Sequence, residues 1–157
     1  MTVDELKKYG IEEMRTEEMV RFLETQSTGV LGLPASADPY LLPLSFAFDG
    51  ESSLFFTYLL GAESRKEMLT EQAETGKFLV YAAETMFNWR SVLLSGRFEA
   101  VPPSEWGDLS ELFEGVWRPD LFQTANTSRN VTIYKFEITD WSGIKHMGLA
   151  PGFEATE

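Results

Sequence analysis

The sequence has no cysteine and only one histidine, and this composition limits the kinds of catalytic and metal sites that the protein could contain. Without cysteine, disulfides, thiolate metal sites, iron–sulfur clusters and cysteine nucleophiles are excluded together. The one histidine, His146, has no evident partners for a metal or haem site, and no Gly-x-Ser-x-Gly motif supports a serine hydrolase. We therefore find no acid–base pair and no metal site, and we expect His146 at the surface or in a dimer contact.

Basic residues are also scarce. The chain carries 13 Lys and Arg against 25 Asp and Glu, for a formal net charge of -12. Such a surface repels phosphate backbones, so we expect no nucleic-acid partner. An acidic excess with few lysines also suits a protein that stays hydrated in concentrated salt, and we hypothesise a halophilic, haloarchaeal source.

Long apolar runs are missing as well. No run approaches the roughly 20 residues needed to span a bilayer, and the polar segment 1–8 lacks the apolar core of a signal peptide. We therefore expect no membrane partner and a cytoplasmic location. The length of 157 residues predicts a single domain, with a loose arm or short helix over 1–15 and a C-terminal tail over 143–157.

Hydrophobic periodicity predicts a mainly β fold with peripheral helices. Alternating or continuous apolar runs predict strands over 29–33, 40–48, 54–58, 77–82, 89–101 and 131–141. Helical spacing predicts helices beginning at Thr16, Ser64 and Ser104. Five or six strands with few helices suggest a small antiparallel barrel.

Proline, glycine and aperiodic segments predict where strands are interrupted and where turns and loops lie. Pro43 cannot donate a ladder hydrogen bond, so we expect strand pairing to be interrupted or bulged there. Gly50 should turn the chain tightly into an antiparallel hairpin. Gly76 is expected to end the helix that begins near Ser64. Residues 117–130 lack a clear period, and we expect a long loop there.

The most informative stretch runs from Leu54 to Gly76. An aromatic-rich strand leads through a short connector to a helix that opens with Ser64, Arg65 and Lys66. Free backbone amides, the positive end of the helix dipole and two cations together predict a phosphate site at this helix start. The alternative is a solvated helix start, since composition alone produces about one adjacent basic pair in a chain of this kind.

Two motifs in this region resemble the pyridoxamine 5'-phosphate oxidase-like family of FMN-binding split barrels. The family's strand of two aromatic residues and Thr leading to Ser-Arg-Lys is similar to 55–57 followed by 64–66. Its Arg-Gln-Val strand ending in Gly is similar to 90–92 ending at Gly96. The resemblance spans roughly 28–142 and is closest to the flavin-nucleotide-binding, nitroimidazole-reductase-like branch.

The resemblance implies a six-stranded antiparallel split barrel, and a homodimer with FMN at the subunit interface. In that family the Arg and Lys hold the flavin phosphate, which assigns Arg65 and Lys66, while Ser64 adds a hydroxyl. Two further groups of residues would contact the flavin ring and its ribityl chain. The first group is Leu44, Ser45, Phe46, Phe56, Thr57 and Tyr58. The second group, on the other side, is Trp89, Ser91 and Val92. Arg90 or Lys145 of the partner subunit would stand near the pyrimidine edge of the flavin.

The sequence also departs from the family. The family's Gln is Ser91 here, and 141–147 lacks the substrate-holding Arg-Leu-His-Asp-Arg run, so we do not expect pyridoxamine phosphate as substrate. The first hypothesis is an FMN-dependent oxidoreductase acting on a small organic acceptor, with a reduced nicotinamide or deazaflavin as electron donor. The alternatives are a flavin-binding module without turnover, for storage, sensing or assembly, and a deazaflavin-dependent reductase on the same barrel.

Overall fold

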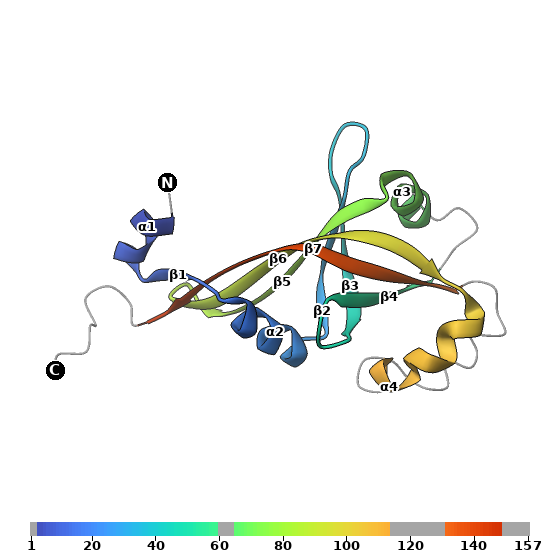
Figure 1. Cartoon of the computed structure of the whole chain (residues 1–157). Helices are drawn as coiled ribbons and strands as arrows, with labels where there is room; N and C mark the ends of the chain where they lie inside the picture. The colour runs from blue at the N-terminus through green and yellow to red at the C-terminus, as the bar shows by residue number, and fades with distance from the viewer. Residues whose placement is uncertain (1–2, 60–64, 114–130, 149–157) are drawn as a thin grey trace.

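The computed structural model describes residues 3–59, 65–113 and 131–148 (Figure 1). The helices and 3-10 turns are α1 (Val3–Leu6), η1 (Lys7–Tyr9), α2 (Thr16–Thr25), α3 (Arg65–Ala73), η2 (Pro103–Leu109) and α4 (Ser110–Phe113). The strands are β1 (Ile11–Glu13), β2 (Thr28–Leu33), β3 (Tyr40–Phe48), β4 (Ser53–Leu59), β5 (Thr75–Thr85), β6 (Asn88–Val101) and β7 (Val131–Met147). The loop predicted over 117–130 lies outside the described residues.

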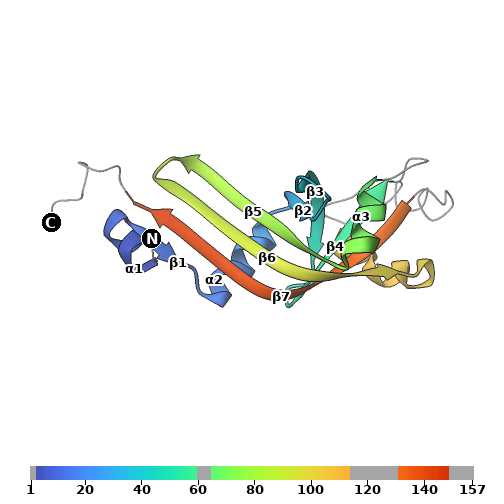
Figure 2. The same cartoon turned by 90° about the horizontal axis from the view of Figure 1, so that it is seen from above.

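Six of these strands close into an antiparallel barrel, which confirms the predicted fold class. The strands follow the order β7-β4-β3-β2-β5-β6, and pairing of β6 with β7 completes the ring. β6 pairs with β7 from Val101 to Asn88, so it occupies one edge of β7 almost throughout. The other edge pairs first with β4 and then, near its end, with the short β1. Figure 2 shows β6 and β7 running side by side along the molecule.

Aromatic and aliphatic side chains fill the barrel. Phe46, Phe56, Phe78 and Phe136 are all at most 1% exposed, as the alternation along their strands predicts. Helix α2 packs its buried residues against the same core, namely Met19, Phe22 and Leu23. The apolar stripe of this helix therefore faces the core, as predicted.

The β6–β7 ladder has a bulge at Thr139 of β7, next to a position where the two strands approach closely. The register between β6 and β7 shifts between Ser95 and Gly96. A Cβ on Gly96 would lie 2.5 Å from the Phe136 ring and 2.7 Å from the carbonyl oxygen of Glu137. Such distances are far below van der Waals contact, so this position of the barrel requires glycine.

The structure corrects the predicted end of α3. This helix ends at Ala73, and Gly76 lies in β5 instead. Glu74 takes the left-handed conformation with φ 60, and its amide donates to the Thr70 carbonyl to close the last turn. Gly76 has a different role, since a Cβ there would lie 2.8 Å from the Phe98 ring.

Pairing at Pro43 is also different from the prediction. β2 and β3 stay in register through the Val30–Pro43 pair, with no interruption. β4 pairs with β3 only over Phe46–Phe48, so β3 has a free edge at Pro43 where a missing amide is tolerated. The predicted hairpin after β3 is confirmed, with Gly50 at φ 85 and the Asp49 carboxylate accepting from the amides of the turn.

Within the described residues, the segment predicted as a loose arm or a short helix contains the short helix α1, the turn η1 and the strand β1. Residues 11–13 form β1, which pairs with 144–146, and β7 continues to Met147 rather than ending near Trp141. Ser104 does not cap a helix, because it lies inside η2, which begins after Pro102. None of the helices in the described ranges is both long and apolar enough to cross a bilayer.

Candidate functional site

The start of α3 carries two cations, Arg65 and Lys66. Lys66 is half-buried, with its Nζ 5.4 Å from the centre of the Tyr58 ring, and this burial lowers the pKa of its ammonium group. The Arg65 guanidinium lies 5.4 Å from the centre of the Tyr40 ring. Among the described residues, neither cation forms an ion pair. Ser64 and its predicted cap lie outside the described residues.

The aromatic strand β4 divides its side chains between the core and the outside. Phe56 and Tyr58 are fully buried in the barrel, and the Tyr58 hydroxyl lies 2.9 Å from Thr70 Oγ1. Burial raises the pKa of the Tyr58 phenol. Because their rings pack in the core, a contact between these two residues and a ligand outside the barrel would use their backbone rather than their side chains.

Thr57 lies between them and points the other way. Its Oγ1 is buried, yet it has no hydrogen-bond partner within the part of the chain that the structure describes. An unsatisfied buried hydroxyl costs free energy, so a bound group that accepts or donates here would be stabilising. Among residues 56–58, Thr57 is therefore the one whose polar side-chain atom is left without a partner by the described residues.

Strand β3 shows the same division. Phe46 is buried in the core and Leu44 packs against it, while Ser45 is exposed on the outer face. A hollow of about 510 Å³ lies beside this strand, lined by residues 25–30 with Pro43 and Tyr81. The sequence analysis did not select the polar residues 25–28 as candidates for this hollow. Their position between a helix and a strand is the signal that could have identified them.

The second predicted group lies on β6 and β7. Arg90 is exposed and stands directly opposite Lys145 in the ladder, and Val92 is fully buried in the core. Ser91 is half-buried. The Trp89 indole donates to the Met86 carbonyl at 3.2 Å, close to the β5–β6 turn.

The ladders connect the two predicted groups across the barrel wall. Ser45 on β3 pairs with Thr28 on β2, and β2 pairs in turn with β5 through Val30 and Leu79. On β5, Tyr81 pairs with Ser91 on β6. Since neighbouring strands lie about 4.8 Å apart, the β3 and β6 members of the two groups are separated by three strand spacings, about 15 Å.

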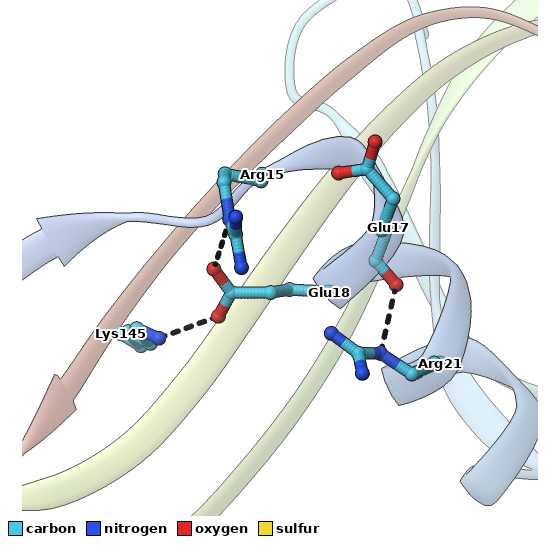
Figure 3. Close-up of polar contacts among 5 residues, drawn as sticks. All are labelled: Arg15, Glu17, Glu18, Arg21 and Lys145. Carbon is cyan, nitrogen blue, oxygen red and sulfur yellow. Dashed lines mark hydrogen bonds and ion pairs between the residues drawn. The ribbon is translucent and has the colours of Figure 1, made fainter.

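Lys145 is held within its own protomer. Its Nζ donates to Glu18 on α2 at 2.5 Å, and Arg15 donates to the other carboxylate oxygen at 3.2 Å (Figure 3). The hydrogen bond from Lys145 is the main cause that lowers the pKa of Glu18 to about 2, with Arg15 adding to it. The sequence analysis did not predict this pairing, which joins residues 127 positions apart in the chain.

His146 is buried rather than at the surface. It is 8% exposed, and its ring lies between two segments distant in sequence. Nδ1 lies 2.5 Å from the Phe87 carbonyl oxygen and Nε2 lies 2.8 Å from that of Tyr9. Both oxygens are acceptors and a neutral imidazole donates from one nitrogen at a time, so His146 hydrogen-bonds one of these carbonyls in each tautomer while its ring lies between the β5–β6 turn and the N-terminal segment.

The closed six-stranded antiparallel barrel, with a cation pair at the start of the helix that follows its β3–β4 hairpin, defines the split-barrel class. The sequence profile of the family described as pyridoxamine 5'-phosphate oxidase matches residues 15–145, and the chain belongs to that family. No curated protein matches this chain by sequence.

Solved structures share this fold at low sequence identity. A FAD-binding protein from Mesorhizobium loti has a TM-score of 0.70 and 16% identity, over 87% of this chain and 99% of that chain. A Bacteroides thetaiotaomicron protein assigned to 5-nitroimidazole antibiotic resistance has a TM-score of 0.68 and 14% identity, over 86% and 87%. A FAD and heme binding protein from Mycobacterium smegmatis has a TM-score of 0.64 and 16% identity, over 94% and 77%.

Proposed function

We propose that this protein binds FMN and serves as a flavin-dependent oxidoreductase with a small-molecule substrate. The observation that carries the proposal is Lys66, a half-buried cation at the start of α3 with no ion-pair partner among the described residues. Burying a cation is costly unless an anion compensates it. A phosphate monoester at this helix start would supply that anion, with Arg65 as a second donor.

Thr57 supports the same ligand. Its buried and unsatisfied hydroxyl lies on the strand that belongs to the family's first motif. The exposed Ser45 and the backbone of Leu44 and Phe46 would provide further contacts on β3. When bound, the flavin itself supplies the electron-transfer chemistry, so the protein needs to bind it, orient it and limit access of water.

The proposal includes a homodimer with the cofactor between subunits. This is the arrangement that the family resemblance implies for the second group of predicted contacts, Trp89, Arg90, Ser91 and Val92. Arg90 of the partner subunit is then a candidate for the pyrimidine edge. Lys145 fits this role less well, because Glu18 of its own protomer already holds it.

The relatives support a flavin ligand, but the flavin that they are described as binding is FAD, whereas we propose FMN for this chain. The structures from M. loti and M. smegmatis are described as FAD-binding. We favour FMN for this chain because the Arg65 and Lys66 pair matches the motif that holds a flavin monophosphate in the family.

The first test replaces both cations, as Arg65→Gln together with Lys66→Gln. Two charge-assisted contacts would be lost, so the Kd for FMN should rise by about 100-fold, measured by quenching of flavin fluorescence. Lys7→Gln with Lys8→Gln is a matched control, since it removes an adjacent basic pair elsewhere in the chain. A correctly folded double variant that binds FMN as tightly as the parent would contradict the phosphate site.

A second measurement separates an enzyme from a binding module. The FMN-loaded protein is mixed anaerobically with a reduced nicotinamide, and loss of flavin absorbance is followed. Bleaching, with recovery on adding an acceptor, is the expected result for an oxidoreductase. A stable yellow protein with every donor tried would favour storage or sensing, and mass analysis of the released ligand would reveal a deazaflavin.

A further inference from the structure

A second cationic region lies away from α3, in a pocket between α2 and the ends of β6 and β7. The pocket has a volume of about 420 Å³. Three cations line it, Arg21 from α2, Arg90 from β6 and Lys145 from β7, together with one carboxylate, Glu18. Figure 1 shows α2 and α3 on different parts of the barrel.

The charges in this pocket are not balanced. Lys145 is compensated, because it pairs with Glu18. Arg90 makes no hydrogen bond or ion pair with any residue that the structure describes. Arg21 uses its Nε to donate to the Glu17 carbonyl at 3.3 Å, and its two terminal NH₂ groups have no partner in the described ranges. Two guanidinium groups with unused donors therefore line the same pocket.

This imbalance is unexpected in so acidic a molecule. The chain carries 25 carboxylates against 13 cationic side chains, so partners for two arginines are abundant. Uncompensated like charges that share a pocket repel one another, and a bound anion would relieve that repulsion. Guanidinium groups present paired donors that match the oxygens of carboxylates and phosphates.

Apolar side chains complete the lining of the pocket beside the charged ones. Met14 and Phe22 line it and are both buried in the core. Arg15 and Lys145 fix Glu18 from two sides, as Figure 3 shows, and Arg21 lies one turn further along α2. The pocket thus combines fixed charges with an apolar surface, as sites for small organic ligands do.

We propose that this pocket binds a small organic oxyanion, a carboxylate or phosphomonoester carried on an apolar body. Arg21 and Arg90 would hold the oxyanion, and the apolar part would contact Phe22 and Met14. Arg90 and Lys145 are also candidate flavin contacts, so the test rests on Arg21, which belongs to this pocket alone.

The experiment titrates the full-length protein with benzoate, phenyl phosphate and inorganic phosphate by calorimetry, with and without added FMN. Benzoate or phenyl phosphate should bind at least tenfold more tightly than inorganic phosphate, and comparison of the first two identifies the preferred oxyanion. Equal or tighter binding of inorganic phosphate would overturn the proposal, because the apolar body would then contribute nothing. Binding without FMN shows the pocket to be independent of the flavin.

Arg21→Gln should weaken binding of the preferred probe by about tenfold or more, because a charged hydrogen-bond donor is lost. Arg97→Gln, which removes an exposed arginine elsewhere on β6, is the matched control and should bind as the parent does. A crystal soaked with 4-bromobenzoate should place its carboxylate between Arg21 and Arg90. Unchanged affinity in Arg21→Gln, or bromine signal only at other places, would overturn the assignment.

Discussion

Glu18 joins helix α2 to the end of β7 through a single carboxylate. Its pKa is lowered to about 2, chiefly by the hydrogen bond from Lys145. Folding therefore favours the ionised form of Glu18. The contribution of this carboxylate to the stability of the folded protein is fully present above the ordinary pKa of 4.5, and it is lost as the pH falls toward 2. Since both side chains retain some exposure, solvent screening reduces the contribution to on the order of 1 kcal/mol.

Glu18→Gln should therefore lower the free energy of unfolding by about 1 kcal/mol at neutral pH and by progressively less as the pH falls toward 2. The measurement is urea denaturation at a series of pH values. Glu17→Gln is the control, because this neighbouring side chain is exposed and only its backbone carbonyl is used by Arg21. A deficit in Glu18→Gln that stays constant across the acid range would show that ionisation of Glu18 is not its cause.

At the scale of residues, the sequence pattern located charges better than it located contacts. The motif 64–66 correctly marked a helix start with two cations, as α3 from Arg65 shows. It could not show that Phe56 and Tyr58 turn inward while Thr57 turns outward, because residues 54–56 are all apolar and give no alternation that separates the two faces of β4. The pairing of Glu18 with Lys145 spans 127 positions and depends on the final fold.

At the scale of elements, long periodic segments were predictable and short ones were not. The alternation in 89–101 and the stripe of α2 are strong signals, and the structure confirms both. β1 has only three residues, too few for any period, and it forms because β7 offers it a free edge beyond the end of β4. The end of α3 was misplaced because Glu74, not a glycine, takes the left-handed conformation there.

β1 depends on His146 as well as on its ladder with β7. His146→Leu removes the contacts to the carbonyl oxygens of Tyr9 and Phe87, at a cost of about 1–3 kcal/mol for the segments it links. Amides of β1 should then exchange with deuterium roughly 10 to 100 times faster, while those of the barrel core stay unchanged. Hydrogen exchange followed by mass spectrometry measures this.

Met147→Leu serves as the control for this experiment, because Met147 is an exposed neighbour on the same strand. If exchange accelerates equally in β1 and in the barrel, His146 supports the whole fold rather than the N-terminal segment, and the interpretation is wrong.

At the scale of the whole molecule, the net charge of -12 sets the response to salt. Repulsion among carboxylates destabilises the compact state, and salt screens it over a distance that falls from about 10 Å at 0.1 M to about 3 Å at 1 M. Tm should therefore rise by several degrees over this range of KCl, which is the behaviour expected of a halophilic protein.

Scanning calorimetry in KCl checks this prediction. A variant with the exposed acids Glu99, Glu105 and Glu111 changed to Gln provides the comparison, since its Tm should depend less on salt. A Tm that does not change with KCl would remove the argument for a salt-adapted surface.

Strand β7 also determines when the barrel can form during synthesis. It closes the ring between β4 and β6, yet it is the last of the described strands to be made. While the ribosome is still translating residues before 131, β4 and β6 each present an unpaired edge, and β1 has no partner at all. Exposed edges of this kind promote pairing with other chains. The nascent chain is thus most prone to aggregation in the seconds just before 131–147 emerges from the exit tunnel.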